Sequence, residues 1–532
     1  MPVLEIKEFS GGISAFADRG IRGSFKFGSG LDIRKQVDTL TCQQALVEEG
    51  LLGTSHSSSQ SISPSPSPSP SGSQSPSVSP SRSSSRSQSP SSSASRSNSY
   101  SQSPSSSQSP SSSVSLSLSP SAGLNNVFVD LILFFVKASD GATYGFGNAG
   151  NIYRRYADGF TRMVYTDPDG PIKGAIEKPS SITTYLQWAT DTKLKRKPLP
   201  GLSNWNDVET IASNLTGADW HTMKQVGGAN MIANGSNIAM VGYDDSYTNE
   251  ALNLVPGNIA KTIIERSGRA VIGTYKAGYP NKGVNGAIDC EVPLVQIGDD
   301  GEIFFSNFND SMPVRRFPGG GRVNPGGVSN EIDQIEIFDW EQNALSWIDK
   351  QTLGNMSLWG VFNADEGKNG VYTYGRKNKE QPISLNLEYV LEVDEIGAIA
   401  NIEGTTIISY RDGSDFGVRA VDPDNKAQGV WEGLEFRSPV KYPINITTFK
   451  YVEVFMSPLP AGSSVKLYYK KNKTGNFVQA SLSNGVDAYT ISGGKKAVFR
   501  IAEEMDIYEP RLVLTPYGNN SPEILRIRTY FS

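Results

Sequence analysis

The chain has 532 residues and a formal net charge of −5 at pH 7, with 37% hydrophobic and 19% charged residues. This small net negative charge argues against a general nucleic-acid-binding surface. The opening MPVLEIKEFSGG lacks the apolar stretch of a secretory signal, and the longest apolar run, Val127–Val136, is too short to span a bilayer and includes Asp130. We therefore expect no signal peptide and no membrane span, and we interpret this run as a buried strand.

Histidine and cysteine are scarce. Cys42 and Cys290 lie far apart, so the sequence has no disulfide framework and no cysteine cluster for a metal. His56 lies in a low-complexity stretch, which leaves His221 alone to build any histidine-based site. In ADWHTMKQ this residue follows Asp219, but a lone structural histidine is the favoured interpretation. We expect no catalytic residue, no cofactor and no metal.

Residues 1–53 are expected to form an N-terminal segment with the first strands of the fold. KEFSGGISAF contains a Gly-Gly turn, and KQVDTLTCQQALVEEG begins with partial alternation of apolar and polar residues at Val37, Leu40 and Cys42. A short helix through CQQALVEEGLL is the alternative to a strand, because Gln, Ala, Leu and Glu favour helices.

Residues 54–123 form a serine tract in which every odd-numbered position from Ser57 to Ser121 is serine. Period two matches a strand, but the prolines at Pro64, Pro66, Pro68 and Pro70 lack the N–H that a ladder needs. The tract also has too little apolar area to offset the entropy of ordering. We predict an extended, polyproline-II-biased insertion in a loop of the first blade, since exposed loops tolerate insertions.

Residues 124–428 repeat one theme: an apolar strand, a turn, an aromatic strand and a polar loop. VKASDGATYGFGNAGNIYRRY and MIANGSNIAMVGYDDSYT show it, with Asp-Gly and Asn-Gly pairs that suit hairpin turns. The repeats recur roughly every 40–60 residues, which is typical of propeller blades or solenoids. We predict a divergent β-propeller of about six to seven blades.

Residues 429–532 differ from the preceding repeats in their sequence pattern, with strand-like segments at short intervals. YVEVFM, VKLYYKK, RLVLTPY and EILRIRTYFS alternate well over a span of about 100 residues, which fits an antiparallel β-sandwich. The predicted fold is therefore all-β, with a propeller followed by a C-terminal sandwich.

Two kinds of charged motif could carry binding. The acidic turns TDPDG, GYDDS, GDDG and VDPDN place carboxylates close together, as calcium sites do, but each is also a good plain turn, which we favour. The basic runs TKLKRKPLPG and SMPVRRFPGGGR could contact phosphate. For the first of these runs we favour a solvated strand edge guarded by lysines.

The opening IKEFSGGISAF, the divergent propeller and the ending VWEGLEFRSPVKYP…SPEILRIRTYFS together resemble virion proteins of tailed bacteriophages. In its architecture and its general sequence pattern, the chain is similar to tail hub or nozzle subunits and to packaged-DNA stabilisation proteins of short-tailed phages. This resemblance implies a non-enzymatic structural subunit of the tail or neck. It also implies partners among other virion proteins and copies of itself, and a place in the virion.

An alternative is a carbohydrate-binding or glycan-cleaving propeller used in adsorption to a host surface glycan. It requires aromatic and acidic residues that converge at one propeller face. The candidate glycan contacts are Tyr243 and Asp244 from one blade, and Tyr410 and Asp412 from another.

Overall fold

Every element in the described residues of the computed structural model is a β-strand, and the predicted all-β class is confirmed. Among the described residues no helix is long and apolar enough to cross a membrane. The structure describes residues 3–9, 12–13, 24–33, 39–49, 128–155, 161–199, 205–218, 221–254, 256–266, 269–276, 368–375, 384–402, 404–437 and 447–532, with further strands between 294 and 362. The serine tract lies outside them.

Three complete four-stranded antiparallel sheets follow one another, and each keeps chain order from its first strand to its last. The first holds β8 (Ile132–Lys137), β9 (Thr143–Gly147), β10 (Asn151–Arg155) and β11 (Thr161–Thr166). The second holds β12 (Gly174–Pro179), β13 (Thr184–Ala189), β14 (Leu194–Leu199) and β15 (Glu209–Ala212). The third holds β16 (Met223–Val226), β17 (Ala229–Asn234), β18 (Asn237–Val241) and β19 (Tyr247–Asn253).

The pattern continues through the middle of the chain. A pair is formed by β20 (Asn258–Arg266) and β21 (Arg269–Lys276), followed by the sheet β22 (Leu294–Ile297), β23 (Ile303–Ser306), β24 (Pro313–Phe317) and β25 (Asp333–Glu336). The next group holds β26 (Leu345–Ser346), β27 (Thr352–Leu353), β28 (Met356–Val361), β29 (Gly370–Gly375) and β30 (Ser384–Val390). The last holds β31 (Glu395–Ile402), β32 (Thr405–Asp412) and β33 (Asp415–Lys426).

In most of these groups the first strand lies against the first strand of a neighbouring group: β8 beside β12, β12 beside β16, β16 beside β20, β20 beside β22, and β31 beside β8. In the group that precedes β31, the strand that lies beside it is β28. Four-stranded meanders that meet through their first strands form a β-propeller. In the described residues the groups number seven, so the predicted propeller of six to seven blades is confirmed.

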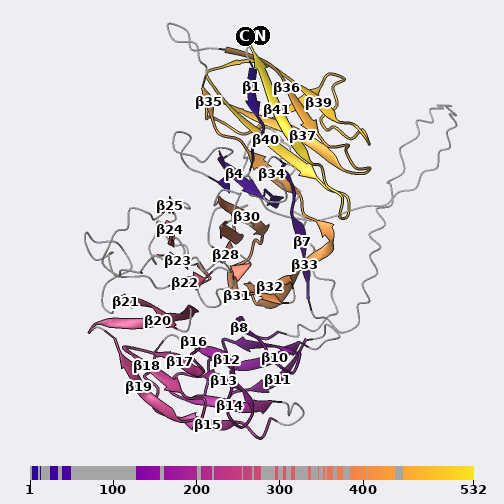
Figure 1. Ribbon diagram of the computed structural model, residues 1–532. Helices are drawn as coiled ribbons and strands as arrows, with labels where there is room; N and C mark the ends of the chain where they lie inside the picture. The colour runs from indigo at the N-terminus through magenta and orange to yellow at the C-terminus, as the bar shows by residue number, and fades with distance from the viewer. Residues whose placement is uncertain are drawn as a thin grey trace, which may run out of the picture. The chain divides into compact units, whose positions relative to one another are not determined.

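The N-terminal segment contributes strands to both parts of the fold. Its strands are β1 (Val3–Ile6), β2 (Gly12–Ile13), β3 (Ser24–Phe25), β4 (Phe27–Ser29), β5 (Leu31–Asp32), β6 (Thr41–Cys42) and β7 (Gln44–Glu48). In Figure 1 the indigo strands β1, β4 and β7 lie among brown, orange and yellow strands from the C-terminal half. The stretch that also allowed a helix is a strand, because β7 pairs with β33 and tertiary pairing overrides local propensity.

The C-terminal sandwich contains β34 (Gly429–Glu432), β35 (Phe436–Arg437), β36 (Thr447–Met456), β37 (Ser464–Lys471), β38 (Val478–Leu482), β39 (Lys496–Met505), β40 (Ile507–Thr515) and β41 (Ile524–Phe531). One sheet has the order β1-β41-β36-β39, visible together in Figure 1, and the other has the order β37-β40-β34. The strand β38 pairs with both sheets. Alternate apolar residues such as Val452, Leu467 and Ile527 are buried between the sheets, as the sequence alternation predicted.

Candidate functional site

The serine tract is flanked by strands of two neighbouring sheets. On its N-terminal side β7 is the fourth strand of the sheet β31-β32-β33, with Glu48 opposite Arg419 and Val47 opposite Ala420. On its C-terminal side β8 is the first strand of the next sheet. The prediction that the tract interrupts a loop within the first blade was therefore wrong. The two flanks meet where the first and last sheets of the propeller adjoin, and we call this place the closure seam.

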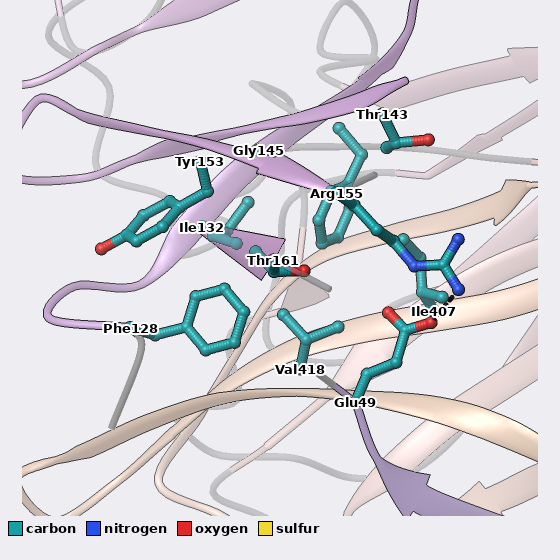
Figure 2. Close-up of a pocket in the computed structure, with 11 residues that line it drawn as sticks. Glu49, Phe128, Ile132, Thr143, Gly145, Tyr153, Arg155, Thr161, Ile407 and Val418 are labelled. Atoms are coloured by element: carbon teal, nitrogen blue, oxygen red, sulfur yellow. Dashed lines mark ion pairs between the residues drawn. The ribbon is translucent and has the colours of Figure 1, made fainter. Parts of the chain in front are cut away.

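A small pocket lies at the closure seam (Figure 2). Glu49, just after β7, forms an ion pair with Arg155 at the end of β10. The apolar side chains of Ile132, Ile407 and Val418 line the space beside this pair. Burial raises the pKa of Glu49, and the guanidinium of Arg155 opposes that shift. The enclosed space has room for about one water molecule, so the pocket acts as a packed joint between sheets.

A buried carboxylate fixes the chain where it enters β8. The Asp130 side chain is 4% exposed and accepts hydrogen bonds from the Tyr153 hydroxyl and, at 2.7 Å, from the Ala149 backbone N–H. Burial, together with this hydrogen bond, raises the pKa of Tyr153. A methyl group on Gly147 would collide with the Asp130 carboxylate, which explains why glycine stands there. These contacts fix the chain at the start of β8, and they occupy the Asp130 carboxylate with hydrogen bonds.

The four predicted glycan contacts fall in two separate sheets. Tyr243 and Asp244 lie in the turn after β18, where Tyr243 is 55% exposed and the Asp244 carboxylate accepts hydrogen bonds from Ser246. Those bonds lower the pKa of Asp244. Tyr410 and Asp412 lie at the end of β32, in the sheet that closes the propeller.

The strand order keeps the two pairs apart. The turn after β18 follows the third strand of its sheet, whereas Asp412 ends the second strand of its own sheet, just before the turn to the third. Successive turns of a meander lie at opposite ends, and the sheets of a propeller begin at the same face. Tyr243 and Asp412 are therefore directed to opposite faces of the propeller. The strand order does not bring the four predicted glycan contacts together at one face.

Tyr410 is also occupied locally. Its hydroxyl donates to Glu48 Oε1 at 2.8 Å, and the guanidinium of Arg419 lies 4.9 Å from its ring centre. Burial and the Glu48 carboxylate raise the pKa of Tyr410. These contacts hold β7 to its sheet, so the tyrosine contributes to closure of the propeller.

The first basic run forms a network of ion pairs, some buried and some partly exposed. Its strand, β14, lies between β13 and β15, and Lys195 and Lys197 are 4% and 0% exposed. Each cation has an acidic partner: Lys193 with Asp169, Lys195 with Asp167 and Asp169, Arg196 with Glu209 and Asp245, and Lys197 with Asp207. The favoured interpretation as a solvated edge was wrong, because β14 is interior. In the second run, the side chains of Arg315, Arg316 and Arg322 lie outside the described residues.

Three of the acidic turns are described, and each is stabilised as a turn. The backbone N–H of Asp169 donates to Asp167 Oδ1 at 2.9 Å, and that of Asp424 donates to Asp422 Oδ1 at 2.8 Å. The lysines Lys193 and Lys195 lower the pKa of Asp169. In the described part of the chain, no group of three or more ligating side chains could hold a metal ion. The turn GDDG lies outside the described residues.

His221 is a buried link between the second and third sheets. Its ring nitrogens lie 2.8 Å from the Ala233 carbonyl oxygen and 2.9 Å from the Asp191 carbonyl oxygen. Burial lowers the pKa of His221, although both carbonyls favour the protonated ring. The favoured interpretation of a structural histidine agrees with these contacts.

A set of residues that the sequence analysis did not single out gathers on the sandwich. The sheet β1-β41-β36-β39 buries one face in the core and carries charged and aromatic side chains on the other, which we call the outer sheet face. The strand registers place its members in three rows across the strands: Val3, Tyr530, Tyr451 and Arg500; Glu5, Arg528, Glu453 and Val498; and Arg526, Phe455 and Lys496. Each member lies on an outward position of an alternating strand.

The side chains of the outer sheet face contact one another closely. The rings of Tyr451 and Tyr530 stack with centres 4.4 Å apart. The Tyr530 hydroxyl donates to Glu453 Oε2 at 2.9 Å, and Arg528 donates to Glu5 Oε1 at 2.7 Å. The pKa of Glu5 is lowered by Arg528, and that of Tyr530 is raised by Glu453. The face thus presents stacked rings beside fixed donors and acceptors.

The comparisons with known proteins find distant fold likeness only. No protein-family model and no curated protein matches the chain. Virginiamycin B lyase from Staphylococcus aureus is 13% identical over 56% of this chain and 98% of its own, with a TM-score of 0.37. The WD40 β-propeller domain of Doa1 is 13% identical over 56% and 93%, with a TM-score of 0.35. The Cps50 (Swd1) β-propeller domain from Myceliophteria thermophila is 10% identical over 56% and 98%, with a TM-score of 0.37. None of their activities carries over at such identities, and the strand order itself establishes the propeller.

Proposed function

We propose that the chain is a non-enzymatic structural component of a tailed-bacteriophage virion, a tail or neck subunit that assembles with copies of itself and with other virion proteins. The observation that carries the proposal is the shared strand β4. It pairs with β34 of the sandwich on one side and with β30 of the propeller on the other.

The β4 junction makes one hydrogen-bonded sheet out of two domains. Ser29 lies opposite Val430 in an antiparallel pair and opposite Leu387 in a parallel pair. Domains joined by a linker alone move against each other by default. Here the propeller and the sandwich cannot separate without breaking the ladder, and a subunit that bears load in a particle benefits from this coupling.

The neighbouring N-terminal strands support the same role. β1 is an edge strand of the sandwich, and β7 completes the last sheet of the propeller. One segment of fewer than 53 residues thus holds the sandwich, the junction and the closure seam. We propose that the serine tract, which joins β7 to β8, projects from the subunit as an appendage, because insertions at surface connections leave the packed sheets unchanged.

The alternative, a glycan-binding propeller, is not proposed. It needs Tyr243, Asp244 and Asp412 at one face, and the strand order directs their turns to opposite faces.

The proposal is tested by the protein content of virus particles. Particles produced by the genome that encodes this chain are purified by density gradient, treated with protease to remove adsorbed protein, and analysed by quantitative mass spectrometry. The expected result is that peptides from the sandwich and the propeller co-sediment with the major capsid protein in a fixed ratio across gradient fractions. If the chain remains in the lysate and is missing from the particle fractions, the proposal is wrong.

A further inference from the structure

We propose that the outer sheet face of the sandwich binds an oligosaccharide. This inference rests on the geometry of the face and stands independently of the virion role. It differs from the propeller hypothesis in its location, because all of its residues belong to β1, β36, β39 and β41.

Paired aromatic rings supply the apolar part of the site. Tyr451 and Tyr530 are half-buried and stack at 4.4 Å, so together they present a rigid patch at the surface. Phe455 lies four residues beyond Tyr451 along β36, with the Arg526 guanidinium 4.3 Å from its ring centre. The C–H faces of a pyranose ring pack against such surfaces, and tyrosine loses little entropy when it binds.

Carboxylates and cations supply the polar part. Glu453 accepts from the Tyr530 hydroxyl at 2.9 Å and pairs with Lys496 at 2.5 Å, while Glu5 pairs with Arg528 at 2.7 Å. These contacts fix the side chains beside the rings before a ligand arrives. A sugar hydroxyl donates and accepts at once, so neighbouring hydroxyls can bridge a carboxylate and a guanidinium.

The charge pattern argues against the other large ligands. A nucleic acid binds where cations are in excess and free to meet phosphates. Here four cations stand beside two carboxylates, but three of the cations already have an acidic partner: Lys496 pairs with Glu453, and Arg526 and Arg528 pair with Glu5. Interface cores are depleted of charge, and a protein partner would have to remove five charged side chains from water. These are Glu5, Lys496, Arg500, Arg526 and Arg528, while Glu453 is already buried. Sugar hydroxyls can replace the hydrogen bonds of the water that they displace from these groups, because a hydroxyl both donates and accepts.

The test is affinity gel electrophoresis of the full chain in gels cast with soluble dextran, mannan, xylan, galactan or hyaluronan. Where a polysaccharide retards the protein, the binding affinity is then measured by isothermal titration calorimetry with the matching oligosaccharide. The variants are Tyr451→Ala and Tyr530→Ala, which remove the stacked rings. The matched control is Tyr517→Ala, which removes an aromatic ring that is 60% exposed on the sandwich but outside the face. Circular dichroism melting confirms that each variant folds, and Tyr530→Phe keeps the ring if Tyr530→Ala does not fold.

We expect retardation by at least one polysaccharide, about tenfold weaker binding in each alanine variant, and unchanged binding in the control. Glu5→Gln should weaken binding without changing the fold, since it removes a charged acceptor. Three results would overturn the proposal: no retardation by any of the five polysaccharides, equal binding by wild type and the two alanine variants, or binding of an oligothymidylate through the same tyrosines in place of a sugar. Because none of these results depends on virus particles, failure here is distinguishable from failure of the virion proposal.

Discussion

Lys195 of β14, in the second propeller sheet, donates to the carboxylate of Asp167 across 2.6 Å. Asp167 follows β11 of the first sheet, and both side chains are buried. The indole N–H of Trp188 donates to the other oxygen of the same carboxylate at 2.7 Å. The acidic turn and the basic run, which look like separate surface motifs in the sequence, are therefore two halves of one internal network.

Replacement of Lys195 by methionine should destabilise the fold by about 3–5 kcal/mol, because it leaves the Asp167 charge buried without its cation. Chemical denaturation followed by tryptophan fluorescence measures this change. The control is Lys193→Met, since the Lys193–Asp169 pair is partly exposed and should contribute less than about 1 kcal/mol. Equal losses in the two variants would show that burial of the pair is unimportant.

Local patterns predicted much of the fold. The Asp-Gly pair before β9 and the Asn-Gly pair before β18 form hairpin turns in which Gly141 and Gly235 have positive φ, as that turn chemistry requires. The alternating segments YVEVFM and EILRIRTYFS became β36 and β41, each with one face in the core. These features depend on neighbours in sequence, so the sequence reveals them.

Pairing between distant segments was not predictable in the same way. Tyr451 and Tyr530 meet only because β36 and β41 pair in one register, and a shift of one residue would turn each side chain to the opposite face. Likewise, the three- to five-residue strands β1, β4 and β7 carry too little local signal to name partners hundreds of residues away. The outer sheet face and the β4 junction are both products of such pairing.

The stability of the chain should fall as the pH decreases from about 7 to 5. Burial holds the pKa of His221 below its ordinary value, so in this window the unfolded state binds more protons than the folded state, and acid favours unfolding. Nearby Lys173, whose ammonium lies 2.8 Å from Asp191 Oδ1, acts in the same direction. Urea denaturation at several pH values measures the change.

The His221→Gln variant should lose most of this pH dependence, because glutamine does not titrate. The sequence holds one other histidine, His56 in the serine tract, so His56→Gln is the matched control and should behave as wild type. A wild-type stability that stays flat from pH 7 to 5, or a dependence that survives in His221→Gln, would contradict the assignment.

Gly147→Ala should destabilise the first sheet by about 1–3 kcal/mol, because the added methyl group collides with the buried Asp130 carboxylate. The control is Gly217→Ala, where the nearest atoms to an added methyl belong to Asp191 at 3.5 Å, an ordinary contact distance. Thermal unfolding of both variants measures the difference. If Gly147→Ala is as stable as Gly217→Ala, then Asp130 does not occupy the position described.

Ser29→Pro should uncouple the two domains. Proline cannot donate to a ladder and is excluded from the middle of a sheet, and Ser29 pairs on both sides. Calorimetry of the wild type should show the sandwich and the propeller unfolding together, and the variant should show two separate transitions. Ser29→Ala keeps the backbone donor and should unfold as wild type does. Two transitions in the wild type would mean that β4 does not couple the domains.

Electron cryo-microscopy of the purified virus particles tests the central claim, that the propeller and the sandwich work as one body in a virion. The account predicts density in the tail or neck in which every symmetry-related copy shows both domains, joined through β4 in the same arrangement. Particles whose tail and neck density is fully assigned to other chains would contradict it.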